Sequence, residues 1–283
     1  MACYKLAEMT VKDLQGYLKK NRTIILPYGV VEQHGFHLPL NTDTICAEEL
    51  AVRLADRMGW AVAPAVGYCF SGGMLEGTIN IKPNTFALMM GEIVESLALQ
   101  GFENIFILPG HGGSESLEVL KESLRILKWL NPALHKVMIQ MLLVWNFSDE
   151  FTAAYKARDY HAGYVETSLM LYFRPELVRK EIVMDEPAVA EMLRNDPDSY
   201  QARTSFTAMH GEICNTTQRR AVKVGVMGYP EKSSADLGKG LTETIVNNAA
   251  VALAQAVTQA DVARKTGKMV EHANQNLLKI LSI

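Results

Sequence analysis

The chain has 283 residues, 28 basic and 31 acidic side chains, a formal net charge of −3, and a hydrophobic content of 48%. This composition is that of an ordinary globular protein and excludes a disordered chain or a coiled coil. The near-neutral charge argues against a nucleic-acid partner, and the most apolar run, residues 137–145, falls short of the roughly 20 residues that a membrane span needs.

Strand-like and helix-like segments alternate in the first 150 residues. Gly101 stands where a helix commonly ends in a left-handed glycine, and Ser114 is expected to cap the helix that follows it. The expected strands are residues 23–27, 61–64, 104–110 and 136–144. The expected helices are residues 44–58, 84–100, 114–130, 163–173 and 236–263.

Such alternation predicts parallel βαβ units, and therefore an α/β fold with helices on both faces of a mostly parallel sheet. Residues 185–220 are polar and turn-rich, and no element is assigned to them. The chain shows no repeat and no linker, so we expect a single domain over residues 1–283.

Four cysteines (Cys3, Cys46, Cys69 and Cys214) lie far apart and form no C-x-x-C pair. This spacing argues against a disulfide framework or a thiolate zinc site and favours reduced thiols. The first residues lack the basic and apolar regions of a signal peptide. A cytoplasmic protein is therefore expected.

The loop after the first expected strand, residues 32–43, carries two carboxylates and two imidazoles. Glu32 and His34 are two residues apart, so in extended backbone their side chains point the same way. Asp43 stands close to a helix start. It is either an ordinary N-cap or a carboxylate that bridges two cations.

Two further loops carry histidines. His111 follows the strand at 104–110 and is surrounded by glycines, which let the backbone approach a ligand closely. A phosphate-binding loop is a weaker interpretation, because the lysine and spacing of a P-loop are missing. His161 precedes an expected helix that has Glu166 in its first turn.

The carboxyl ends of parallel strands bring such loops together. Mixed imidazole and carboxylate ligands suit Zn, Mn or Fe, and a shared carboxylate suits two ions. Two such ions polarise a carbonyl and lower the pKa of a bridging water to about 7. The alternative is that His34 and His111 are ordinary buried histidines at turns.

These residues resemble the creatininase (creatinine amidohydrolase) family, in family order from about residue 20 to 250. The matching segments are Leu26–Gly29, Glu32–Pro39 with Asp43, Gly72, Gly77–Thr78, Pro109–Gly113, Trp145, His161, Glu166–Ser168 and Gly225–Gly228.

The resemblance implies a three-layer α/β/α domain with a short central sheet, commonly assembled as a homohexamer. It also implies a site for two divalent metal ions. By position, Glu32 and His111 hold one ion, His34 and Glu166 hold the other, and Asp43 bridges them.

The resemblance further implies that His161 is the catalytic acid/base, which delivers a proton to the leaving nitrogen. Ser71 and Gly112 fall at substrate-contacting positions, and Trp145 matches an aromatic pocket wall. His37 matches no family ligand and is expected to support the ligands from behind.

Two departures from creatininase concern the pocket. Gly113 stands where creatininase has a glutamate that acts in catalysis and at one metal. The segment between Trp145 and His161 is shorter, and Ala157, Arg158 and Tyr160 lie where the lid of creatininase closes, which makes Tyr160 an expected substrate contact.

The resemblance therefore implies a hydrolase in which metal-bound hydroxide attacks the carbonyl of a small cyclic amide or formamide, other than creatinine. The runner-up activity is hydrolytic C–C ring cleavage of a cyclic diketone from inositol catabolism. A non-catalytic, metal-stabilised binding protein is the alternative from another class, favoured by Gly113. Arg158, His210 and Glu212 could shape the pocket, although an ordinary surface insertion over residues 195–220 is favoured.

Overall fold

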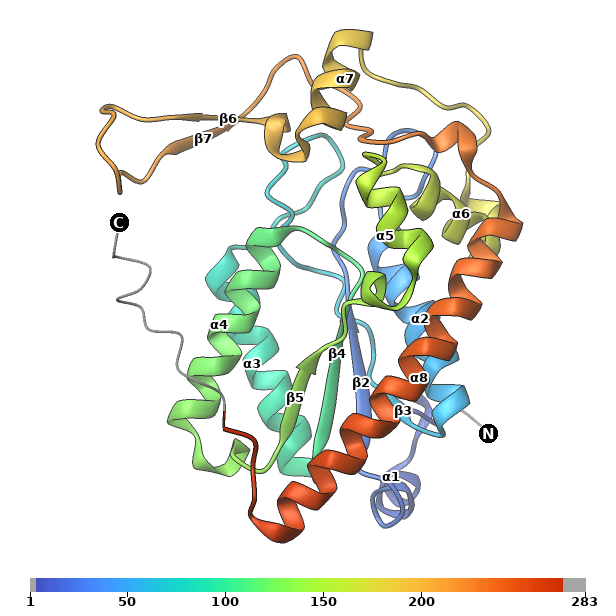
Figure 1. The fold of residues 1–283 in the computed structure, drawn as a ribbon, viewed down its shortest axis with the longest axis vertical. Coiled ribbons are helices and arrows are strands. Elements are labelled where there is room, and N and C mark those ends of the chain that lie inside the picture. Colours follow the sequence, from blue (N-terminus) through green and yellow to red (C-terminus); the bar gives the residue numbers. More distant parts are fainter. Residues whose placement is uncertain (1–3, 272–283) are drawn as a thin grey trace.

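The computed structural model describes residues 4–271. At its centre lies a five-stranded sheet in the order β1–β3–β2–β4–β5, in which every neighbouring pair is parallel (Figure 1). The strands are β1 (Tyr4–Lys5), β2 (Thr23–Tyr28), β3 (Ala61–Val62), β4 (Asn104–Pro109) and β5 (Met138–Met141).

The two long central strands are buried on both faces, and successive side chains enter different cores, as the two-residue period of a strand requires. Ile24 and Leu26 pack with α1, α3 and α4, whereas Ile25 packs with α2, α6 and α8. The bounds of these helices are α1 Val11–Leu18, α2 Thr42–Met58, α3 Pro83–Gln100, α4 Ser114–Leu130, α6 Tyr164–Phe173 and α8 Ala235–Thr266. The expected three-layer α/β/α architecture is confirmed.

All four expected strands and all five expected helices are present, within a few residues of the expected bounds. The sequence pattern missed β1, α1 and four elements that follow β5 in the chain, because most of these are short. These four elements are α5 (Asp149–Lys156), α7 (Pro187–Asn195), β6 (Gln201–Thr204) and β7 (Asn215–Gln218). The short 3₁₀ helices are η1 Leu6–Glu8, η2 Pro132–Leu134, η3 Val144–Phe147, η4 Pro175–Leu177, η5 Pro197–Tyr200 and η6 Pro230–Lys232.

The helix ends confirm the expectation for Gly101 and correct those for Ser114 and Asp43 as caps. Gly101 ends α3 with φ of 109°, as expected. Ser114 is not a cap, because Gly113 occupies the N-cap position and Ser114 is the first helical residue. Asp43 is not a cap either: α2 begins after Asn41, and Asp43 lies within the first turn.

Strands β2 and β4 end side by side, with Tyr28 paired to Pro109. The loops that follow them therefore leave the same edge of the sheet, next to α5, α6 and the antiparallel pair β6–β7 (Figure 1). Over residues 4–271, no helix is both long and apolar enough to cross a bilayer.

Candidate active site

The carboxylate of Asp43 lies between two imidazoles. Its Oδ1 is 3.0 Å from His34 Nε2, and its Oδ2 is 3.2 Å from His111 Nδ1. Two more carboxylates complete the group: Glu32 Oε2 is 3.2 Å from His111 Nδ1, and Glu166 Oε2 is 3.8 Å from His34 Nε2. The structure thus brings together five side chains from three segments that are far apart in the sequence, with Asp43 and Glu166 in the first turns of α2 and α6.

The loop after β2 orients the first of these side chains. The backbone N–H of Glu32 donates to the carbonyl of Leu40 at 2.9 Å, which folds the loop back on itself. His34 Nδ1 lies 3.1 Å from the carbonyl of Glu32. When Nδ1 donates to that carbonyl, Nε2 is left as the ring nitrogen that can bind a cation between Asp43 and Glu166, as in metal-binding histidines.

The loop after β4 passes very close to its neighbours, which explains two of its glycines. A Cβ on Gly110 would overlap the backbone of Asp43, and a Cβ on Gly113 would overlap the ring of His111. Only glycine lets this loop reach the cluster while the ring of His111 keeps its position between Glu32 and Asp43.

The third loop is held by the buried carboxylate of Asp159, which the sequence pattern did not single out. Its oxygens accept the backbone N–H groups of Tyr164, Val165 and Tyr229 at 2.9–3.1 Å. The carboxylate therefore holds the first turn of α6 in place, and Glu166 lies in that turn.

Several buried atoms of the cluster make no well-oriented hydrogen bond, which is rare in folded proteins, although three of them lie 3.0–3.2 Å from an ion-pairing partner. These atoms are Glu32 Oε2, His34 Nε2, Asp43 Oδ2 and His111 Nε2. Ligand atoms within 4.8 Å of one another form three groups: Glu32, Asp43 and His111; His34, Asp43 and Glu166; and Glu32, His34 and His161. The first two groups share Asp43, so the donor set fits two divalent cations with one bridging carboxylate.

Burial and mutual charge set the ionisation of the cluster. Burial lowers the pKa of His34, but Asp43, Glu166 and Glu32 outweigh this and raise it to about 10. The charges of Glu32 and Asp43 likewise raise the pKa of His111 well above its ordinary value, against the effect of burial. Burial, with the charges of Asp43 and Glu32, raises the pKa of Glu166 to about 7.

Burial raises the pKa of Asp43, but the two imidazoles outweigh this and hold it well below the usual range of a carboxyl. The same balance lowers the pKa of Glu32, since His111 and His161 outweigh burial. Two carboxylates therefore stay ionised, which is the state in which they bind a cation.

His161 lies against this cluster, with its ring 4.3 Å from the ring of His34. Its Nε2 is 2.7 Å from the carbonyl of Gln33 and 3.1 Å from the side-chain nitrogen of Gln33. One tautomer cannot make both hydrogen bonds, and the shorter contact favours an N–H donated to the carbonyl. Burial and the charge of His34 lower the pKa of His161 to about 4, so its ring is neutral near pH 7.

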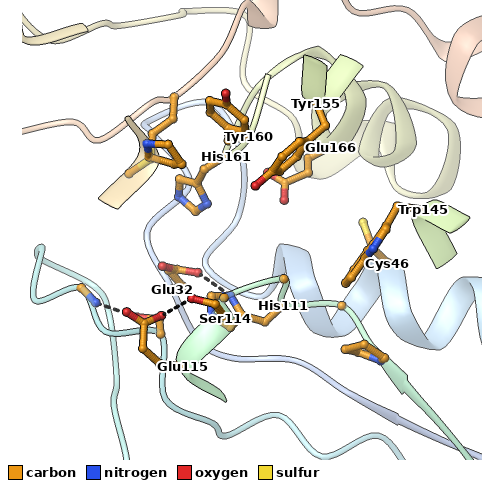
Figure 2. A pocket seen from close by; sticks show the side chains of 18 of the residues that line it. Glu32, Cys46, His111, Ser114, Glu115, Trp145, Tyr155, Tyr160, His161 and Glu166 are labelled. Carbon is orange, nitrogen blue, oxygen red and sulfur yellow. Dashed lines mark hydrogen bonds and ion pairs between the residues drawn. The ribbon is translucent and has the colours of Figure 1, made fainter. Parts of the chain in front are cut away.

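A cavity of about 520 Å³ opens above the cluster (Figure 2). The expected substrate contacts Ser71, Gly112, Trp145 and Tyr160 all line it. Residues that the sequence did not indicate line it as well. They include Phe151, Thr152 and Tyr155 from α5, Glu115 from α4, and Pro197, Asp198, Tyr200 and Gln218 around β6–β7.

The other residues that the sequence indicated do not line the cavity. His37 is buried, and its Nε2 meets the hydroxyl of Thr167 at 3.0 Å, next to Glu166. Arg158 lies near Glu191 and Asn195 on the surface. His210 and Glu212 lie on the exposed connection between β6 and β7, so only the base of the 195–220 segment shapes the cavity.

The family model described as creatininase, creatinine amidohydrolase, matches residues 7–253. The creatinine amidohydrolase of Pseudomonas putida is 27% identical over 200 residues, 64% of this chain and 76% of that protein. The mycofactocin precursor peptide peptidase of Mycolicibacterium smegmatis is 27% identical over 237 residues, 80% of this chain and 82% of that protein.

A solved structure described as creatininase with Mn superposes with a TM-score of 0.70 at 23% identity, covering 90% of this chain and 98% of that one. Another, a mutant creatininase of the Zn–Zn type, has a TM-score of 0.69 at 23% identity and covers 89% of this chain and 97% of that one. These structures share the fold of the chain.

Proposed function

Because the chain belongs to the creatininase family of hydrolases, we propose that it is a divalent-metal-dependent amidohydrolase. Its substrate is a small cyclic amide or a formamide, other than creatinine, and the bond cleaved is C–N. The observation that carries the proposal is the position of Asp43, whose two oxygens face His34 and His111 separately.

Five side chains hold two ions in this proposal. Glu32 and His111 hold one, His34 and Glu166 hold the other, and Asp43 bridges them. Support comes from the buried atoms of this set that make no hydrogen bond and from the Mn and Zn–Zn forms of structures with the same fold. When bound, two divalent ions polarise a substrate carbonyl and lower the pKa of water to about 7.

His161 is the proposed acid/base. With Nε2–H donated to the Gln33 carbonyl, Nδ1 is the ring nitrogen that can accept a proton and pass it to the leaving nitrogen. The same ring could instead be a metal ligand, since it lies within reach of Glu32 and His34. Ser71, Gly112, Trp145 and Tyr160 are the proposed substrate contacts, because they line the cavity beside this group.

A peptide bond is a second candidate for the bond cleaved, favoured by the peptidase relative that covers 80% of the chain. C–C ring cleavage of a cyclic diketone has no feature of the cavity in its favour. A homo-oligomer, with six subunits by resemblance, and a cytoplasmic location are proposed with the enzyme. Light scattering after size exclusion tests the first, and cell fractionation tests the second.

Metal content per chain, followed by assays of formamides, lactams, short peptides and cyclic diketones, tests the function. About two equivalents of Zn, Mn or Fe with hydrolysis of an amide support it. Absence of bound metal after incubation with excess Zn or Mn contradicts the assigned ligand set. Turnover of the diketones alone moves the proposal to C–C cleavage.

A further inference from the structure

The cavity above the cluster is larger than a small cyclic amide needs. Its volume of about 520 Å³ lies within the range of about 300–1,000 Å³ that is usual for pockets holding drug-sized ligands. A substrate that fills it therefore extends well beyond the reacting carbonyl. The residues that line the cavity indicate the chemical nature of this additional part of the substrate.

One wall of the cavity is aromatic. It consists of Trp145, Phe151, Tyr155 and Tyr160, and is called the aromatic wall below. The rings of Trp145 and Phe151 are 6.5 Å apart, and those of Tyr155 and Tyr160 meet edge to face at 4.7 Å. These are spacings at which aromatic rings attract one another, so the wall is held together by its own contacts.

The backbone places this wall beside the candidate acid/base. Tyr160 directly precedes His161, and its N–H donates to the carbonyl of Met227 at 2.8 Å. Helix α5 is capped by Ser148, whose hydroxyl accepts the N–H of Phe151 at 3.2 Å. Figure 2 shows Tyr155 and Tyr160 above the space that Glu32, His161 and Glu166 surround.

Tyr155 is 59% exposed although it lines the cavity. An exposed aromatic ring that is already fixed in place offers a bound ring a partner with little loss of side-chain freedom. The wall thus favours a substrate that carries a ring of its own.

The charged residues around the cavity disfavour substrates that carry a free carboxylate away from the reacting carbonyl. Among the described residues that line it, none is lysine or arginine. Glu115 and Asp198 are among the lining residues, and Arg203, which does not line the cavity, lies 3.6 Å from Glu115. A free carboxylate on the far part of a substrate would therefore meet no lysine or arginine in the lining, and Arg203 is already paired with Glu115.

We propose that the site accepts uncharged amides in which an aromatic ring is attached close to the scissile carbonyl, and that Phe151 and Tyr155 select for this ring. The proposal rests on the proposed function, because it assumes that the carbonyl lies at the candidate metal cluster. Phe151 and Tyr155 are specificity-determining residues in it.

Equilibrium binding of hydroxamates, which chelate metal ions, to the metal-loaded full chain tests the proposal without requiring turnover. Acetohydroxamate has no ring, phenylacetohydroxamate adds one, and its para-carboxy derivative adds a negative charge. Burying the ring is expected to tighten binding by about 10- to 100-fold, and the carboxylate is expected to remove most of that gain.

The variant Tyr155→Ala is expected to remove most of the gain from the ring, measured as the ratio of the dissociation constants of acetohydroxamate and phenylacetohydroxamate for the same variant. Phe151→Ala is expected to act in the same direction. Phe206→Ala is the matched control, because Phe206 is 91% exposed and does not line the cavity. Since Tyr155 is largely exposed, its replacement leaves the fold intact, and circular dichroism checks this.

The outcomes separate the two proposals. If acetohydroxamate binds and the ring adds no affinity, or if Tyr155→Ala keeps the full gain, the aromatic selection is wrong while the hydrolase proposal stands. If the chain takes up no metal, the proposed function fails. Turnover of N-formylphenylalaninamide above both N-formylglycinamide and N-formylphenylalanine supports ring and charge selection together.

Discussion

The ring of His111 occupies the space that a Cβ atom on Gly113 would need. The resemblance to creatininase places a glutamate at this position, so the glycine removes a carboxylate. In this chain it also makes room for the ring that faces Glu32 and Asp43. The glycine is therefore part of the geometry of the cluster.

Replacing Gly113 by alanine is expected to push the His111 ring away from Glu32 and Asp43. We expect metal affinity to fall by about 10- to 100-fold, the usual cost of losing a group that positions a ligand. Gly112→Ala is the matched control, since a Cβ there would approach only Trp145, at 3.9 Å. Competition with a chelator of known affinity measures both. Equal affinity of the two variants would show that the ring can shift freely.

Asp43→Asn keeps the size of the side chain and removes its charge. Because Asp43 faces both imidazoles, we expect the bound metal to fall from about two equivalents per chain to one or none, and activity to fall with it. Asp149→Asn, an exposed change on α5 outside the cavity, is expected to change neither. Elemental analysis measures the metal content of both variants. Two ions retained in Asp43→Asn would show that Asp43 does not bridge them.

His161→Ala is expected to retain its metal ions and lose at least about 100-fold in rate, the scale typical of a general acid/base. The retained metal separates a proton-transfer role from a ligand role, because His161 also lies within reach of Glu32 and His34. Metal content and rate are measured on the same preparation. Loss of one equivalent of metal would make His161 a ligand.

Metal binding is expected to release protons near pH 7. The carboxylates raise the pKa values of His34 and His111 above neutrality in the protein without metal, so both rings carry a proton there. A ring that binds a cation must lose a proton, so affinity rises with pH through this range. Calorimetric titration with Zn in buffers of different ionisation enthalpy counts the protons, and an identical heat in all buffers would contradict their release.

Asp159→Ala is expected to lower the free energy of unfolding by about 2–4 kcal/mol, because a buried carboxylate that accepts three backbone N–H groups is lost. Glu181→Ala, an exposed change in a loop, is expected to cost less than about 0.5 kcal/mol. Denaturant unfolding measures both. A small effect at Asp159 would mean that water replaces the carboxylate as acceptor.

Much of the fold could be predicted because its signals are local. The apolar runs that form β2 and β4 and the helix-length amphipathic stretches between them are readable within a dozen residues. The sequence also indicated the cluster residues, since Glu32, His34 and Asp43 lie in one loop and His111 ends a neighbouring strand. Missed elements such as α1 and α5 have eight residues each, too few for a clear period. The Thr10 and Asp13 capping box was nevertheless a usable signal for α1.

By itself the sequence determined the α/β class, the loops that carry the chemistry and the residue types in them, because propensity and periodicity act over short distances along the chain. The tertiary structure alone decided that Asp43 faces both His34 and His111, that Gly113 yields its space to a ring, and that α5 lines the cavity with aromatic side chains. Asp43 and His111 are 68 residues apart, and α5 begins 106 residues after Asp43. Gly113 is only two residues from His111, but the ring lies there because it faces Glu32 and Asp43. These relationships depend on strand order, register and packing, which no local pattern of residues specifies.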